Sequence, residues 1–187
     1  VIEKLSEKAD VTALDALSLA VEAGSPKAVN VVLMGVVAKH MEFSKDGKFM
    51  YCIAELSGEV LVYEISEQNG MPAFCLIQQI QADEVNAGGS ADIHIHPSGK
   101  WLYTSHRLDN DGIAIFKVSE DGLIEKCGYQ PTGSHPRHFA ISHDGRTLVS
   151  ATRDSGTLEV FSIDPSTGSI HIREQHKADK PVFVILK

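Results

Sequence analysis

The sequence predicts a mainly β fold: about three four-stranded antiparallel blades of an incomplete β-propeller, preceded by a short α-helical hairpin. The chief observation is an internal repeat, seen in the phrases EFSKDGKFMY, HIHPSGKWLY and AISHDGRTLV. The turn glycines of these phrases, Gly47, Gly99 and Gly145, lie 52 and then 46 residues apart, which is the period of a propeller blade rather than of a helical solenoid. Three blades are fewer than the roughly four to eight that close a propeller.

Within each copy, apolar residues alternate with polar ones, as in antiparallel strands with one buried face. In the first copy Met41 and Phe43 alternate, a turn follows at residues 45–47, and Phe49, Tyr51 and Ile53 alternate again. We therefore expect one propeller region, residues 39–187, with blades at about residues 40–88, 90–131 and 135–180 and the start of a further blade at residues 181–187.

Residues 1–38 have a different pattern. Apolar residues recur at helical spacing between residues 14 and 21, and Gly24 then stands where a helix commonly ends. Pro26 follows at a position suited to the first turn of a second helix. A helical hairpin is the favoured interpretation, and a valine-rich blade strand at residues 29–37 is the alternative.

Composition excludes several classes of protein. The net charge is -8 and no Lys/Arg cluster appears, so we expect no nucleic-acid partner. No apolar run reaches the ~18 residues of a membrane span, and the N-terminus lacks a secretory signal pattern. Three cysteines, Cys52, Cys75 and Cys127, lack metal-binding spacing and are expected to be buried thiols in a cytoplasmic protein.

Two resemblances divide the chain. The segment AVEAGSPKAVNVVLMGVVAKH resembles the end of the small subunit of indolepyruvate-type 2-oxoacid ferredoxin oxidoreductases, without a catalytic group. From about His40 onward, the phrases HMEFSKDGKFMYCIAELSGEVLVYEI, IHPSGKWLYTSHR and GSHPRHFAISHDGRTLVSATRDSGTLEVFSID resemble the C-terminal half of the lactonase family of seven-bladed propellers. The junction at residues 37–40 replaces the family's Gly-Pro-Arg-His, which suggests a chimeric chain or a mis-assembled gene model.

The lactonase family includes bacterial 6-phosphogluconolactonases and fungal carboxymuconate-cyclising enzymes. The resemblance therefore implies a hydrolase of the pentose phosphate pathway that opens 6-phosphogluconolactone to 6-phosphogluconate, with a small anionic substrate and no cofactor. Such a reaction needs a base for water, a group that stabilises the oxyanion, and cations for the phosphate. The alternatives are an inactive propeller fragment or chimera, or a propeller used only for binding. Exposed sheet edges would favour a homo-oligomer.

The resemblance places the catalytic base at Glu55. The stretch CIAELSG matches the family's Asn-Glu-Leu motif, with Ala54 in place of the asparagine. The alternative is a solvated turn carboxylate. One repeat later, Arg107 in TSHRLDN matches the family's Ser-Asn-Arg motif and is a second catalytic candidate. Its guanidinium suits a carboxylate or phosphate, and the alternative is a surface ion pair with Asp109 or Asp111.

The repeat relates three of these side chains. Glu55, Arg107 and Arg153 each follow their turn glycine by about eight residues, so all three are expected at one end of the propeller. Arg153 stands beside Asp154, which favours a structural role.

The stretch GSHPRHF matches the family's Gly-x-His-Pro-Arg-His motif at the entry of an inner strand. The resemblance makes Arg137 and His135 substrate-binding residues, with Arg137 on an anion or the oxyanion. His138 is a catalytic candidate as a proton carrier. For each histidine, a packed side chain with a backbone partner is the alternative.

His40 and His94 complete the expected substrate-binding set. His94 and His96 alternate with isoleucines and so share a face, as two zinc ligands would. No third ligand has defined spacing, and the family resemblance implies no metal. The sequence therefore predicts a site without a metal ion.

Overall fold

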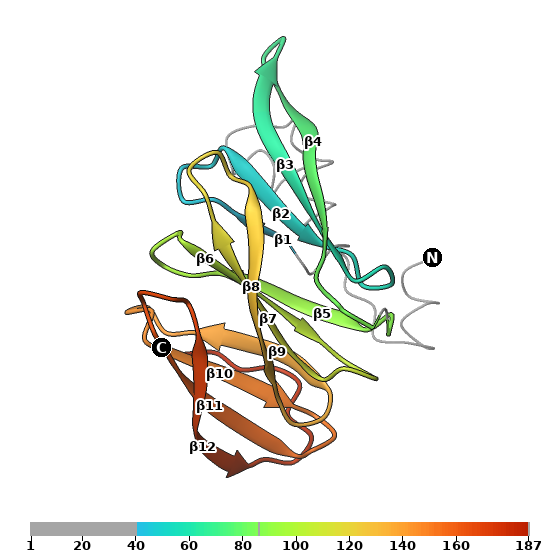
Figure 1. Ribbon diagram of the computed structural model, residues 1–187, viewed down its shortest axis with the longest axis vertical. Coiled ribbons are helices and arrows are strands. Elements are labelled where there is room, and N and C mark those ends of the chain that lie inside the picture. Colours follow the sequence, from blue (N-terminus) through green and yellow to red (C-terminus); the bar gives the residue numbers. More distant parts are fainter. Residues whose placement is uncertain (1–40, 86, 187) are drawn as a thin grey trace, which may run out of the picture.

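The structure, a computed structural model, describes residues 41–85 and 87–186, in which twelve strands form three four-stranded antiparallel sheets (Figure 1). The first sheet contains β1 (Met41–Phe43), β2 (Phe49–Ile53), β3 (Glu59–Gln68) and β4 (Met71–Gln81). The second contains β5 (Ser90–Ile95), β6 (Trp101–His106), β7 (Gly112–Val118) and β8 (Ile124–Pro131). The third contains β9 (Pro136–Ile141), β10 (Thr147–Thr152), β11 (Thr157–Ile163) and β12 (Ile170–Lys177). The predicted mainly β fold with three four-stranded sheets is confirmed.

Some predictions concern the ends of the chain. The helical hairpin at residues 1–38, the junction and His40 lie outside the described residues. Residues 181–186 pair with none of the described strands, so the start of a further blade stays a prediction. In the described part of the chain, no helix has the length and apolar character needed to cross a membrane.

The turn between the first two strands of each sheet depends on its glycine. Gly47, Gly99 and Gly145 have φ angles of 72°, 75° and 70°, a left-handed conformation that glycine adopts without a Cβ clash. In the first sheet, Asp46 Oδ1 accepts a 2.7 Å hydrogen bond from the Ser44 hydroxyl, which fixes the same turn. The repeat in the sequence is thus a repeat of one hairpin geometry.

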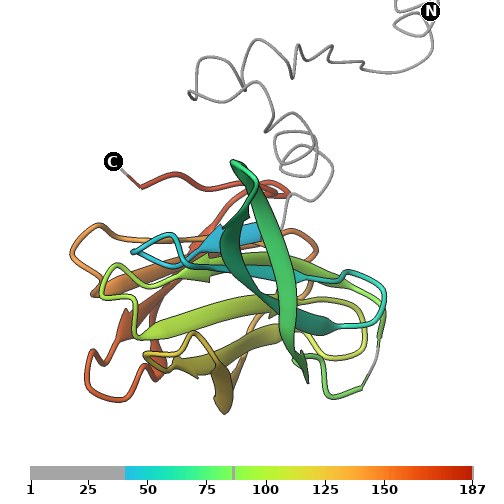
Figure 2. The same ribbon diagram turned by 90° about the horizontal axis from the view of Figure 1, so that it is seen from above.

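The three sheets stack face to face, and Figure 2 shows them overlying one another when seen from above. Their first strands adjoin, because β5 contacts both β1 and β9. One apolar core, which includes Tyr51, Val62, Leu102 and Phe116, fills the space between the first and second sheets. A second core lies between the second and third sheets and includes Tyr103, Phe139, Leu148 and Phe161. The alternating apolar residues of the strands therefore form two inter-sheet layers.

Neighbouring sheets interlock through a repeated contact. The Tyr51 hydroxyl donates a 3.1 Å hydrogen bond to the Gly122 carbonyl in the β7–β8 turn. A Cβ on Gly122 would overlap the ring of Phe49, so only glycine fits there. A Cβ on Gly168 would likewise overlap the ring of Trp101 in the second sheet. The internal repeat thus specifies contacts between blades as well as strands within them.

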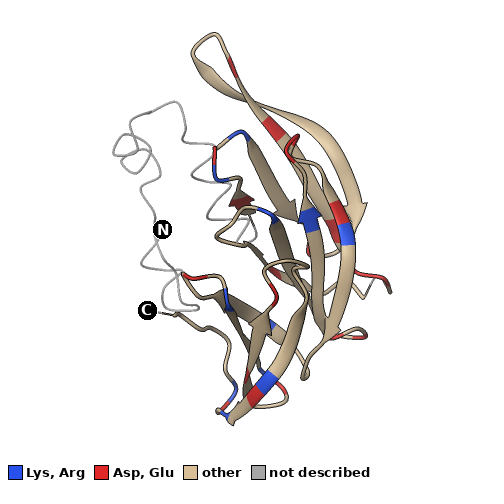
Figure 3. Cartoon of the chain, turned by 60° about the vertical axis from the view of Figure 1, so that its left-hand side comes forward, with Lys and Arg blue, Asp and Glu red and all other residues tan. Residues whose placement is uncertain are grey.

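The structure corrects one expectation about the thiols. Cys52 is partly buried, and burial raises the pKa of its thiol, but Cys75 and Cys127 lie on exposed faces of outer strands. The prediction of three buried thiols is therefore wrong for two of them, because β4 and β8 carry only one buried face. Lys and Arg residues, blue in Figure 3, are spread over the three described sheets.

Candidate functional site

A pocket of about 560 Å³ opens beside the first strands of the three sheets. Five residues that the sequence predicts for the site line this pocket: Glu55, His94, Arg107, Arg137 and His138. His94 lies on β5, and Arg137 and His138 lie on β9. Glu55 and Arg107 lie in the segments that follow β2 and β6. The structure therefore brings together residues that lie up to 83 positions apart in the chain.

Glu55 and Arg107 form an ion pair at one wall of the pocket. Arg107 Nη2 donates to Glu55 Oε1 at 2.7 Å, and Arg107 Nε donates to the Gly89 carbonyl at 2.9 Å. The Arg107 side chain is only 8% exposed, whereas that of Glu55 is 52% exposed. Buried Arg107 thus holds an accessible carboxylate in a fixed orientation.

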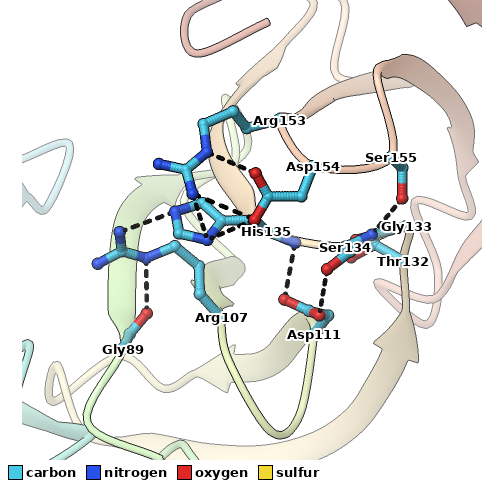
Figure 4. Close-up of polar contacts among 10 residues, drawn as sticks. All are labelled: Gly89, Arg107, Asp111, Thr132, Gly133, Ser134, His135, Arg153, Asp154 and Ser155. Carbon is cyan, nitrogen blue, oxygen red and sulfur yellow. Dashed lines mark hydrogen bonds and ion pairs between the residues drawn. The ribbon is translucent and has the colours of Figure 1, made fainter. Parts of the chain in front are cut away.

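His135 links Arg107 to the third sheet (Figure 4). Its Nε2 lies 3.2 Å from Arg107 Nη1, and its Nδ1 lies 3.4 Å from Arg153 Nη2. The residue has a φ of 62°, and Asp111 Oδ1 secures this conformation by accepting the His135 N–H at 2.8 Å. Burial, with the charges of Arg153 and Arg107, lowers the pKa of His135, which favours its neutral form.

These contacts decide between earlier alternatives. Glu55, Arg107 and Arg153 do lie at one end of the sheets, as the repeat predicts, and His135 connects the two arginines. Arg153 is paired with Asp154 through hydrogen bonds of 2.7 and 3.1 Å, which agrees with a structural role. Among the described residues Arg107 forms its ion pair with Glu55 and with neither Asp109 nor Asp111, and Asp111 instead accepts the His135 N–H.

Arg137 differs from the other arginines of the site. It is exposed and lines the pocket, and within residues 41–85 and 87–186 its guanidinium forms no hydrogen bond or ion pair. A guanidinium without a protein partner is suited to bind an anion that enters the pocket.

A second part of the pocket lining carries two imidazoles and two carboxylates. His94 Nδ1 lies 2.8 Å from Glu42 Oε1, and His94 Nε2 lies 3.2 Å from Asp92 Oδ2. Burial lowers the pKa of His94, but hydrogen bonds to Asp92 and Glu42 outweigh it and raise the pKa to about 9. His138 Nε2 lies 3.7 Å from the same Asp92 oxygen, and burial lowers the pKa of His138.

The sequence predicts that His94 and His96 share a face, but the structure places His94 beside His138. His96 does not join His94, because its nitrogens are engaged by the Gly145 carbonyl at 2.8 Å and the Ser98 hydroxyl at 2.7 Å. His94 instead meets His138 from β9. With Asp92 they form a group whose ligand atoms lie within 4.8 Å of one another.

Sequence reasoning missed Glu42 and Asp92. The repeat carried a signal for both, because Glu42 and His94 each lie five residues before their turn glycine, and Asp92 and His138 each lie seven before theirs. Residues at these equivalent positions meet across neighbouring inner strands, Glu42 with His94 and Asp92 with His138, so the same offsets would have placed the carboxylates beside the histidines.

Comparison with known proteins places the chain. The family model described as Lactonase, 7-bladed beta-propeller matches residues 16–186. The chain belongs to this lactonase family. The match includes part of the N-terminal segment, and the chimeric origin of that segment stays a prediction.

Two relatives of this lactonase-family chain are named 6-phosphogluconolactonase. The protein of Serratia proteamaculans is 38% identical over 155 residues, which cover 80% of this chain and 46% of the relative. That of Yersinia pestis is 36% identical over 161 residues, which cover 83% of this chain and 47% of the relative. The chain thus spans about half the length of these relatives.

Solved structures resemble the described fold. The crystal structure of a putative 6-phosphogluconolactonase from Bacteroides fragilis has a TM-score of 0.71 and 46% identity, covering 76% of this chain and 40% of that one. The Pseudomonas aeruginosa periplasmic gluconolactonase has a TM-score of 0.69 and 30% identity, with the same coverage. The three sheets therefore correspond to part of a larger lactonase propeller.

Proposed function

We propose that this chain hydrolyses a sugar lactone, and that its substrate is 6-phosphogluconolactone, which it converts to 6-phosphogluconate in the pentose phosphate pathway. The observation that carries the proposal is the accessible Glu55 carboxylate, held by buried Arg107 in a pocket that Arg137 also lines. The names of the Serratia and Yersinia relatives support the choice of substrate.

Glu55 acts as the general base. A water molecule attacks the lactone carbonyl carbon while its proton passes to the Glu55 carboxylate. The ring carbon–oxygen bond of the tetrahedral intermediate then breaks, and Glu55 returns the proton to the departing alkoxide. The immediate product is an open-chain carboxylic acid with a free hydroxyl group, and loss of its acid proton to solvent gives the carboxylate, so atoms and charge balance without a cofactor.

Arg137 binds the negative charge of the substrate. Because this guanidinium has no partner among the described residues, it can donate a fork of two N–H groups to a phosphate. The pocket volume of about 560 Å³ lies within the usual range of small-molecule sites. We assign Arg137 to substrate binding and Glu55 to bond cleavage.

Arg107 and His135 act as positioning residues. The Arg107 guanidinium contacts Glu55, the Gly89 carbonyl and His135, so each of its three nitrogens already has a partner within the protein. This assignment differs from the sequence expectation that Arg107 contacts the substrate. The guanidinium fixes the direction of the Glu55 carboxylate towards the pocket.

A lactone hydrolysis assay tests the proposal. Purified chain is mixed with 6-phosphogluconolactone, and the appearance of 6-phosphogluconate is followed by coupled reduction of NADP⁺. We expect the protein to accelerate hydrolysis above the spontaneous rate in the same buffer. A rate equal to the spontaneous one, with folded protein verified by circular dichroism, would refute the function.

We also propose that copies of the chain associate through sheet edges in the cytoplasm. The outer strand β4 exposes Met71, Leu76 and Ile77, and an uncovered strand edge favours pairing. Light scattering should give a mass above that of one 20.3 kDa chain, and a monomer mass would contradict the association. Cell fractionation tests the location, since the Pseudomonas relative is named as periplasmic.

A further inference from the structure

We propose that Asp92, His94 and His138 bind a divalent transition-metal ion of the zinc class. Their ligand atoms lie within 4.8 Å of one another, although the residues come from two different sheets. One carboxylate and two imidazoles form a donor set that zinc accepts, and sites with three protein ligands keep a further position open. The sequence predicts no metal here, because the third ligand becomes visible only when β5 and β9 lie side by side.

The spacing of the donor atoms suits an ion between them. Asp92 Oδ2 lies 3.2 Å from His94 Nε2 and 3.7 Å from His138 Nε2. Ligand atoms at about 2.0–2.2 Å from a tetrahedral zinc stand roughly 3.3–3.5 Å from one another. Rotations of the Asp92, His94 and His138 side chains would therefore bring the donor atoms to these separations.

Outer contacts already hold two of the ligands. Glu42 Oε1 lies 2.8 Å from His94 Nδ1 and holds the proton on that nitrogen, so the ion would bind Nε2 and release the proton of Nε2 to solvent. Metal-binding histidines usually donate their other N–H to such a carboxylate. Asp92 is buried and accepts the Phe139 N–H at 3.0 Å, which secures the carboxylate between the two sheets.

The third ligand requires one contact to change. The Val184 N–H donates to His138 Nδ1 at 3.4 Å, a long hydrogen bond. A neutral imidazole that binds an ion through Nε2 carries its proton on Nδ1, so this contact must be released. Metal binding is therefore coupled to the position of residues 182–184.

Asp92, His94 and His138 line the same pocket as Glu55, so an ion that they held would be accessible from that pocket. An ion at this place would polarise a carbonyl oxygen of a bound molecule. That role rests on the proposed function, whereas binding of the ion does not. The two claims are therefore tested by different measurements.

Isothermal titration with zinc chloride tests the binding. The full chain is first treated with a chelator and dialysed, and the Asp92→Asn and His94→Gln variants are compared with it. We expect one zinc ion per wild-type chain at micromolar concentration or below, and loss of this event in both variants. The His171→Gln variant, altered on the exposed strand β12, should bind as the wild type does.

The wild-type chain alone gives a second readout. On addition of zinc, NMR signals of the His94 and His138 ring nitrogens should shift, while that of His96 stays in place. Absence of zinc binding to the wild type, or binding with unchanged His94 and His138 signals, would overturn the proposal. Neither measurement depends on lactone hydrolysis, so failure of the metal site and failure of the proposed function are distinguished.

Discussion

Arg107 of the second sheet donates a 2.7 Å hydrogen bond to Glu55 of the first sheet. Both residues follow the second strand of their blade, at equivalent positions of the repeat. The ion pair therefore depends on correct stacking of neighbouring blades. Catalysis in this account requires that the fold place one blade's carboxylate against the next blade's guanidinium.

The Arg107→Lys variant tests the positioning role. Lysine keeps the positive charge but loses the fork that contacts Gly89, His135 and Glu55 together. We expect kcat for the lactone to fall roughly 10- to 100-fold because Glu55 is misdirected, while KM stays nearly constant. Steady-state kinetics check this split. A change confined to KM would instead make Arg107 a substrate ligand.

The Arg137→Ala variant tests phosphate binding. Loss of a charge-assisted contact should raise KM for 6-phosphogluconolactone by about 10-fold. Hydrolysis of the unphosphorylated gluconolactone should be unaffected. Arg146→Ala is the matched control, because Arg146 is an exposed arginine in the β9–β10 turn. Equal losses with both lactones would contradict the assignment of Arg137 to the phosphate.

His106 should make stability depend on pH. Burial lowers the pKa of His106 to about 4, whereas the unfolded value is about 6.5. Its contribution is therefore complete above about pH 6.5 and is lost as the pH falls towards about 4, where the unfolded chain binds the extra proton. Relative to His106→Gln, the wild type should lose on the order of 2 kcal/mol between about pH 7 and pH 5.

Urea unfolding at the two pH values measures this difference. The His171→Gln variant, which changes an exposed histidine, should follow the wild type at both. A His106→Gln variant with the same pH dependence as the wild type would show that His106 is not buried in its neutral form.

Two glycine variants test the contact between blades. Gly47 and Gly122 both have positive φ, but a Cβ on Gly47 meets open space, whereas one on Gly122 overlaps the Phe49 ring. Gly47→Ala should cost about 1–2 kcal/mol from backbone strain alone. Gly122→Ala should cost about 1–3 kcal/mol more because the inter-sheet core is overpacked. Equal losses in thermal unfolding would mean that the first two sheets do not interlock.

The strands were predictable because their signals are local. Alternation and the turn residues around Gly47, Gly99 and Gly145 indicated all three described sheets. The repeat offset also predicted that Glu55 and Arg107 share one end. The repeat offset did not predict the direct ion pair between Glu55 and Arg107, because that contact depends on the distance between two blades.

The second part of the pocket lining depends even more on packing. His94 contacts Asp92, two residues away on its own strand, but its other partners, Glu42 and His138, come from the blades before and after it. Alternation along one strand placed His94 and His96 on the same face, yet His96 stands at the turn and binds Gly145. The alternation of residues along one strand predicts which face of the sheet a side chain occupies. It does not predict which residue of the neighbouring sheet that side chain contacts.

The comparison of wild type with Glu55→Gln tests the central claim most directly. Glutamine preserves the shape of Glu55 but accepts no proton, so we expect kcat for 6-phosphogluconolactone to fall by roughly 100-fold or more with little change in KM. Glu125→Gln, on the outer strand β8, should retain wild-type activity. A folded Glu55→Gln variant that retains kcat within about twofold of the wild type would contradict the assignment of Glu55 as the base.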